Sequence, residues 1–173
     1  MFTLPEETHW RQWAPLPLRL IIGYGFMAHG WAKLNRGPAG FAKLLEYTGT
    51  PLPEVTAWVS TFIEILGGLA ILIGAFVAAV SVPLIVMMLV AMFTVHLRYG
   101  FSAINTIGLT PDGPQFGPPG YEVNLLYIAC LLALILGGAG PISLDRLLAR
   151  RKRDPAACKG HVHEQTQEQD CRH

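Results

Sequence analysis

Charged side chains are scarce in this chain: Asp, Glu, Lys and Arg make up 14% of its 173 residues, whereas hydrophobic residues make up 51%. Soluble domains carry about 25% charged residues, so the composition excludes an ordinary soluble domain and predicts an integral membrane protein. The formal net charge is +1, which gives no reason to expect a nucleic-acid partner. The expected surrounding is the lipid bilayer.

Cysteine is also rare, and the three cysteines do not form a disulfide framework. Cys130 lies in an apolar stretch, whereas Cys158 and Cys171 lie in the polar tail. The sequence has no Cys-x-x-Cys pair, haem attachment motif or nucleotide-binding glycine fingerprint, so any electron donor must be a separate molecule. The N-terminus lacks a basic region and a small-residue cleavage site, so no removable signal peptide is expected.

Four apolar stretches dominate the chain, and each is close to the roughly 20 residues that span a bilayer. They cover Leu16–Leu34, Glu54–Val77, Ser81–Leu97 and Tyr121–Gly138. The third stretch has Pro83 in its expected first turn, where proline costs little. The predicted fold is therefore all-α: a four-helix transmembrane bundle, with a long loop rich in Gly and Pro between its third and fourth helices.

The rest of the chain divides around this bundle. Residues 1–15 are expected to be an interfacial arm, 16–148 the membrane domain, and 149–173 a basic, then polar, disordered tail. Between the first two helices, a short amphipathic piece with Phe41, Leu44 and Leu45 is expected to lie at the interface. Ser143 is expected to begin another short interfacial helix.

Basic residues predict the orientation of the bundle. If both termini lie in the cytoplasm, that side carries Arg11, Arg19 and the basic residues of the tail, with a cluster from Arg146 to Arg153. The other side carries only Lys33, Arg36, Lys43 and Arg98. The positive-inside rule therefore predicts N-in, C-in topology in the bacterial cytoplasmic membrane, with several passes.

Ionisable residues inside or at the ends of these apolar stretches are the main functional clue, because a charge in hydrocarbon is costly unless it is paired or hydrated. They are Arg19, His29, Lys33, Glu64, His96, Arg98 and Glu122. The predicted topology places all of them except Arg19 in the outer half of the bundle. Arg19 lies near the inner interface, where anchoring is the expected role.

This cluster favours proton and electron chemistry with a lipid-soluble carrier. His29 and Glu64 are the expected proton-handling groups, and Lys33 or Arg98 would stabilise developing anionic charge. His96, Arg98, Glu122 and Asn124 are expected to complete the site. The leading hypothesis is a membrane redox component that binds a quinone; whether the chain is itself catalytic, as a subunit of a quinone-linked oxidoreductase, stays open.

Two alternatives remain at this point. His29, Glu64, His96 and Glu122 could instead ligate a transition metal, because imidazole and carboxylate suit zinc, copper or iron. The chain could also be a non-catalytic scaffold or transporter subunit, in which ion pairs fix the helix register and charged ends reach the headgroups. A further set of metal-ligating side chains lies in the tail: Cys158, His161, His163, Cys171 and His173.

Several motifs resemble those of the DoxX family of small bacterial membrane proteins. The first two are Arg19-x-x-x-Gly23-x-x-Phe26-x-x-His29-Gly30-x-x-Lys33 and Glu64-x-x-Gly67-Gly68-x-x-x-x-x-Gly74. The others are Gln115-Phe116-Gly117-Pro118-Pro119-Gly120-Tyr121-Glu122-x-Asn124-Leu125-Leu126-Tyr127 and Gly138-x-Gly140-Pro141-x-Ser143-Leu144-Asp145. The resemblance covers about 16–148 and leaves out the arm and the tail.

The resemblance implies a four-helix membrane bundle. Some members are membrane subunits of oxidoreductase systems, the DoxD branch belongs to thiosulfate:quinone oxidoreductase, and others work with redox partner proteins. A soluble or membrane redox partner is therefore expected, while the substrate and the oligomeric state stay open. No catalytic role carries over to a named residue.

Overall fold

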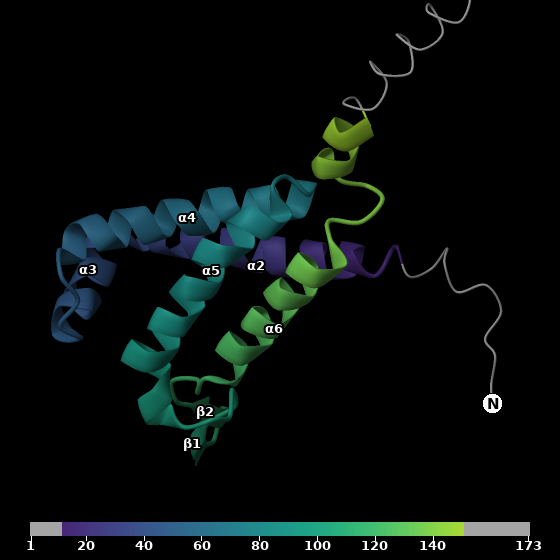
Figure 1. Cartoon of the computed structure of the whole chain (residues 1–173). Coiled ribbons are helices and arrows are strands. Elements are labelled where there is room, and N and C mark those ends of the chain that lie inside the picture. The colour runs from purple at the N-terminus through teal and green to yellow at the C-terminus, as the bar shows by residue number, and fades with distance from the viewer. Residues whose placement is uncertain (1–11, 151–173) are drawn as a thin grey trace, which may run out of the picture.

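The structure, a computed structural model, describes residues 12–150 and is mostly helical, with one small sheet (Figure 1). Helices occur over all four predicted stretches. They are α2 (Pro15–Arg36), α4 (Pro53–Ile73), α5 (Val77–Ala91) and α6 (Glu122–Gly137). The shorter elements are α3 (Pro38–Tyr47), the π-helix η1 (Met92–His96), the 3-10 helix η2 (Leu97–Tyr99), β1 (Thr106–Thr110) and β2 (Gly113–Phe116).

The helices pack as two antiparallel pairs that lie at an angle to each other (Figure 1). α2 runs beside α4, with α3 against the beginning of α4, and α5 runs beside α6. α4 also contacts α5, and α2 contacts α6, so the pairs join along one apolar core. That core is formed by Ile22, Phe26, Ile71, Val77, Leu84, Leu131 and Leu134.

Glycines set the close approach of α2 and α4. A Cβ atom added to Gly23 would lie 2.8 Å from the carbonyl oxygen of Gly68, and one added to Gly68 would lie 2.7 Å from the carbonyl oxygen of Gly23. The two backbones therefore touch where neither residue has a side chain. Small residues serve the same purpose in helix pairs within membranes, where close packing drives association.

Apolar and polar residues are distributed in the reverse of the usual order for a soluble protein. Large apolar side chains along the helices are exposed, among them Ile21, Leu66, Val86, Leu126 and Leu136. The buried polar side chains are Arg19, Thr61, Glu64, Ser81 and Asn124. An apolar exterior around a partly polar interior is what a bilayer requires.

Within residues 12–150, two helical stretches are long and apolar enough to cross a membrane: Pro53–Ile73 and Val77–Tyr99. Glu122–Gly137 is apolar but shorter. α2 has 22 residues but carries Arg19, Lys33 and Arg36. Length and composition thus support membrane crossing most directly for the second and third predicted helices.

The third predicted helix differs from the structure at both ends. α5 begins at Val77, so Pro83 lies inside the helix and not in its first turn. The prediction was wrong because the turn between α4 and α5 is only a few residues long and contains no polar stop signal. At the other end, the α-helix changes to the π-helix η1 before it finishes.

The short predicted interfacial elements are helical. α3 covers the amphipathic piece, and Ala42 and Leu45 are buried against Ala57 of α4. Residues 144–150 are helical after α6. The predicted arm (1–15) and tail (149–173) fall mostly outside the described residues, and all Cys and His residues of the tail do so.

The long loop between α5 and α6 contains a β-hairpin that the sequence did not indicate. β1 pairs with β2 in antiparallel register, from Thr106 opposite Phe116 to Thr110 opposite Gly113. The Gly and Pro residues of this loop predicted turns. They gave no indication that one of these turns joins two short strands. The hairpin lies at the end of the α5 and α6 pair (Figure 1).

Candidate functional site: a buried ion pair between α2 and α4

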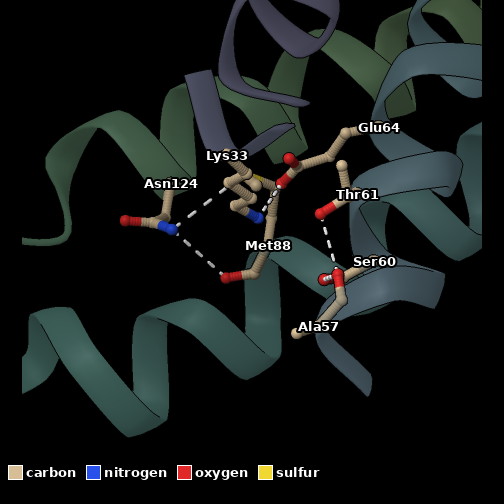
Figure 2. Close-up of polar contacts among 7 residues, drawn as sticks. All are labelled: Lys33, Ala57, Ser60, Thr61, Glu64, Met88 and Asn124. Carbon is tan, nitrogen blue, oxygen red and sulfur yellow. Dashed lines mark hydrogen bonds and ion pairs between the residues drawn. The ribbon is translucent and has the colours of Figure 1, made fainter. Parts of the chain in front are cut away.

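Lys33 and Glu64 form an ion pair between α2 and α4. The Nζ atom of Lys33 donates to Oε1 of Glu64 at 2.7 Å, and the side chains are 22% and 5% exposed, respectively (Figure 2). Within residues 12–150 this is the one carboxylate–ammonium or carboxylate–guanidinium contact within salt-bridge distance. Pairing the two opposite charges lowers the free-energy cost of burying each of them away from water.

Gly30 explains why these two side chains meet. A Cβ atom on Gly30 would lie 3.1 Å from Cβ of Glu64 and 2.6 Å from Cγ1 of Ile65. Because glycine leaves this space free, α4 approaches α2 closely just before Lys33. Lys33 follows Gly30 by three residues, about one helical turn, and so lies on the same face of α2. Its side chain can therefore reach back to Glu64.

The second carboxylate oxygen of Glu64 is the unusual atom of the site. Oε2 is buried and has no hydrogen-bond partner among residues 12–150. An unsatisfied buried acceptor costs about 1–3 kcal/mol, so such an atom is a place where a donor group would bind favourably. A hydroxyl group of a bound molecule would be a suitable donor.

Lys33 is held from its other side by an aromatic ring. Its Nζ atom lies 4.2 Å from the ring centre of Phe41 on α3, which is within the range of a cation–π contact. α3 therefore helps position the ammonium group. Since the Lys33 side chain is partly exposed, the pair is reachable from the end of the bundle where α3 lies.

Polar residues near the pair are satisfied within their own surroundings. Thr61, fully buried one turn before Glu64, donates its hydroxyl to the carbonyl oxygen of Ala57 at 2.8 Å, and Ser60 donates to the same oxygen at 3.0 Å. Asn124 on α6 is 5% exposed and its amide donates to the carbonyl oxygen of Met88 on α5 at 3.3 Å (Figure 2). Asn124 thus joins α5 to α6, beside the pair in the view of Figure 2.

His29 is in a different position from the one expected for a proton partner of Glu64. Its side chain is exposed, and its ring lies 6.3 Å from the ring of Tyr127 on α6, centre to centre. Among the described residues there is no hydrogen bond between His29 and Glu64. The structure therefore brings Lys33 to Glu64 but places His29 on the flank of α2 that faces α6.

The remaining predicted residues fix the long loop. Nδ1 of His96 lies 3.0 Å from the carbonyl oxygen of Pro119, and Oε2 of Glu122 accepts a hydrogen bond from the backbone N–H of Ala103 at 2.8 Å. The guanidinium carbon of Arg98 lies 4.9 Å from the ring centre of Tyr99 and 6.0 Å from that of Tyr47. The expected single cluster is thus divided between the buried pair and the loop.

The four residues considered for a metal are not brought together. In the range 12–150, no group of three or more His, Cys, Asp and Glu side chains is arranged to hold a metal ion. Two of the four candidates, His96 and Glu122, are occupied with backbone groups of the loop. The second metal set, in the tail, lies outside the described residues.

The role expected for Arg19 needs correction. Arg19 is 2% exposed, so its side chain is packed inside the protein and does not extend outward as an anchor would. Its Nε donates to the carbonyl of Ile71 at 2.9 Å and its Nη2 to that of Leu72 at 2.7 Å, while Nη1 donates to Ala139 at 2.7 Å and Ile142 at 2.6 Å. It therefore satisfies carbonyl groups at the end of α4 and after α6.

Gly74 and Asp145 complete this arrangement; both occur in the DoxX-like motifs, but neither was predicted to belong to a site. Gly74 has a φ of +72°, and a Cβ atom there would lie 2.7 Å from the guanidinium carbon of Arg19. The Asp145 carboxylate accepts hydrogen bonds from the N–H groups of Phe76 at 2.7 Å and Val77 at 3.1 Å, which begin α5. The available signal was their position in those motifs, since Gly74 ends the second motif and Asp145 ends the fourth.

Comparison with known proteins supports the resemblance noted in the motifs. Residues 14–97 match the sequence profile of the DoxX family. Two uncharacterized proteins of Haemophilus influenzae are similar to this chain. One is 24% identical over 139 residues, covering 78% of this chain and 83% of the relative, and the other is 29% identical over 130 residues, covering 74% and 85%. No solved structure matches.

Proposed function

We propose that this chain, whose residues 14–97 match the DoxX family, crosses the bacterial cytoplasmic membrane several times as a four-helix bundle. The bundle consists of α2, α4, α5 with its η extensions, and α6. The apolar exterior of these helices supports this placement. The basic residues Arg146 and Arg150 lie at the end where Arg19 lies, which favours N-in, C-in topology.

We propose further that the buried pair of Lys33 and Glu64 is a binding site for a quinone or a similar lipid-soluble redox carrier. The observation that carries this proposal is the free Oε2 of Glu64, buried beside an ammonium group. Such a carrier exchanges two electrons and two protons between its oxidised and reduced forms. Electrons would come from a separate redox partner, since the sequence holds no redox motif of its own.

The two residues would have different roles. Oε2 of Glu64 would accept a hydrogen bond from a hydroxyl of the reduced carrier. When electrons from the redox partner reduce the carrier, a protonated Glu64 would supply one of the two protons as a general acid, and the second would come from water. Nζ of Lys33, already 2.7 Å from Oε1, would donate to a carbonyl or anionic oxygen of the carrier. The partial exposure of Lys33 gives a route for protons at this end of the bundle.

The test is binding of decylubiquinone to the purified full chain in lipid nanodiscs. Glu64→Gln and Lys33→Gln are each expected to weaken binding by a factor of about ten or more, the loss of one charge-assisted hydrogen bond. Glu54→Gln on the exposed start of α4 and Lys43→Gln on α3 are the matched controls and should bind as the native protein does. Equal affinity in all five proteins would refute the quinone site.

A second candidate is a non-catalytic scaffold in which the pair fixes the register of α2 and α4. The backbone contact between Gly23 and Gly68 favours it, because the same two helices already pack closely without a ligand. In this case Glu64→Gln would lower the thermal stability of the protein, and no quinone would bind to either variant or native chain. The binding experiment therefore separates the two functions.

A further inference from the structure

A groove lies at the end of α2 opposite Lys33. It has a volume of about 650 Å³ and is bounded by the beginning of α2, the end of α4 and residues 141–150. Its walls are mainly apolar, with Leu16, Leu20, Leu72, Ile142, Leu144 and Leu147 among the lining residues. A groove of this size can hold part of a small amphipathic molecule.

The rim of this groove is cationic. Arg146 and Arg150 line it, both are exposed, and their spacing of four residues places them on one face of the helix that follows α6. Arg19 adds a third positive charge at the base, although its N–H groups are used by carbonyl oxygens. The lining residues, which belong to the described part of the chain, include no Asp or Glu.

The nearest carboxylate on the same segment is directed elsewhere. Asp145 accepts hydrogen bonds from the N–H groups of Phe76 and Val77 at the start of α5. It therefore does not neutralise the two arginines at the rim through an ion pair. The groove combines an apolar wall with two arginines that form no ion pair with a carboxylate within residues 12–150.

From this complementarity we propose that the groove binds an anionic phospholipid of the surrounding membrane. Arg146 and Arg150 would bind the phosphate of the headgroup, and the apolar wall would hold the beginning of one acyl chain. Arginine pairs well with phosphate because its N–H groups match two oxygens, and basic residues next to a membrane helix attract anionic lipids. The proposal needs the membrane placement but is independent of the quinone site.

Native mass spectrometry of the full chain in mild detergent tests the proposal. Dioleoyl phosphatidylglycerol and dioleoyl phosphatidylcholine, which share their acyl chains, are titrated against the native protein and two variants. R146Q/R150Q should bind phosphatidylglycerol at least tenfold more weakly, whereas R36Q/K43Q, which removes two exposed basic residues at the other end, should bind it as the native chain does. A third variant, Leu20→Trp, should fill the groove and weaken binding while both arginines remain.

Three results would overturn the proposal. Equal binding of both lipids by the native protein would show that charge is not recognised. Unchanged binding of phosphatidylglycerol by R146Q/R150Q would place the lipid elsewhere. Displacement of the lipid by millimolar inorganic phosphate would show that a free anion, and not a membrane lipid, is the ligand.

Discussion

At the scale of single residues, the two buried charged side chains within residues 12–150, Arg19 and Glu64, are stabilised in different ways. Arg19 has four carbonyl partners from distant parts of the chain, whereas Glu64 has one charged partner and one free oxygen. A fully satisfied buried polar group rigidifies its surroundings, and a partly satisfied one is a candidate for binding. Arg19 is therefore interpreted as structural and Glu64 as functional.

Replacement of Arg19 should be severe. Arg19→Met leaves four carbonyl groups without their donor and should lower the free energy of unfolding by about 3–5 kcal/mol. Arg19→Lys should recover only part of this, because an ammonium group cannot reach four diverging acceptors. Thermal unfolding in detergent is the measurement, with the exposed Arg36→Met on the same helix as control. A melting temperature for Arg19→Met equal to that control would contradict the structural role.

The ion pair should respond asymmetrically to mutation. Lys33→Met leaves the Glu64 carboxylate buried without its cation and should cost on the order of 3 kcal/mol, whereas Glu64→Gln leaves a lysine that is partly exposed and still contacts Phe41, and should cost about 1 kcal/mol. The double variant should be more stable than Lys33→Met alone. A double-mutant cycle by chemical denaturation measures the coupling, and strictly additive losses would show that the pair contributes nothing.

At the scale of helices, the sequence predicted the four long helices but not the structure of the segments that connect them. The apolar stretches specify α2, α4, α5 and α6 through their length, and Gly and Pro mark the long loop. The hairpin in that loop depends on pairing between two short strands with no alternating pattern, and sequence periodicity cannot show it. The start of α5 depends on Asp145, a cap supplied from 68 residues later in the chain.

The candidate site was predicted in part for the same reason. Lys33 and Glu64 were both predicted to belong to the site, and the structure brings those two together. The side chain of His29 lies only one turn from Lys33, yet it is on the flank towards α6, because the crossing of α2 and α4 at Gly23 and Gly68 decides which residues meet. How two helices cross depends on both of them, so the residue pattern of one helix cannot predict it.

The glycine crossing gives a prediction for the pair of helices as a unit. Gly68→Ala places a methyl group 2.7 Å from the carbonyl oxygen of Gly23, so the helices must separate, at a cost of about 1–3 kcal/mol. Gly40→Ala on α3 is the control: no atom lies within 4 Å of its added methyl group, and alanine should stabilise the helix slightly. Thermal unfolding of both variants checks this. A Gly68→Ala variant as stable as Gly40→Ala would be inconsistent with close backbone contact.

At the scale of the whole molecule, the proposed topology places the two ends of the bundle in different compartments. In a chain with Cys130, Cys158 and Cys171 replaced by serine, a cysteine at Ser102 in the long loop should react in intact cells with a membrane-impermeant maleimide. A cysteine at Ala149, after α6, should react only when the membrane is opened. Labelling of both positions from outside would contradict N-in, C-in topology.

The hydrogen bonds of Arg19 and Asp145 also constrain the order in which the protein can be completed during synthesis. Nη1 of Arg19 needs the carbonyls of Ala139 and Ile142, and the start of α5 needs the carboxylate of Asp145. A nascent chain that has left the ribosome only as far as α5 therefore contains nearly all of the DoxX match but lacks the groups that complete this end of the bundle. A gene product shortened before Ala139 would lack these acceptors and this cap, so Nη1 of Arg19 and the start of α5 would lose their partners.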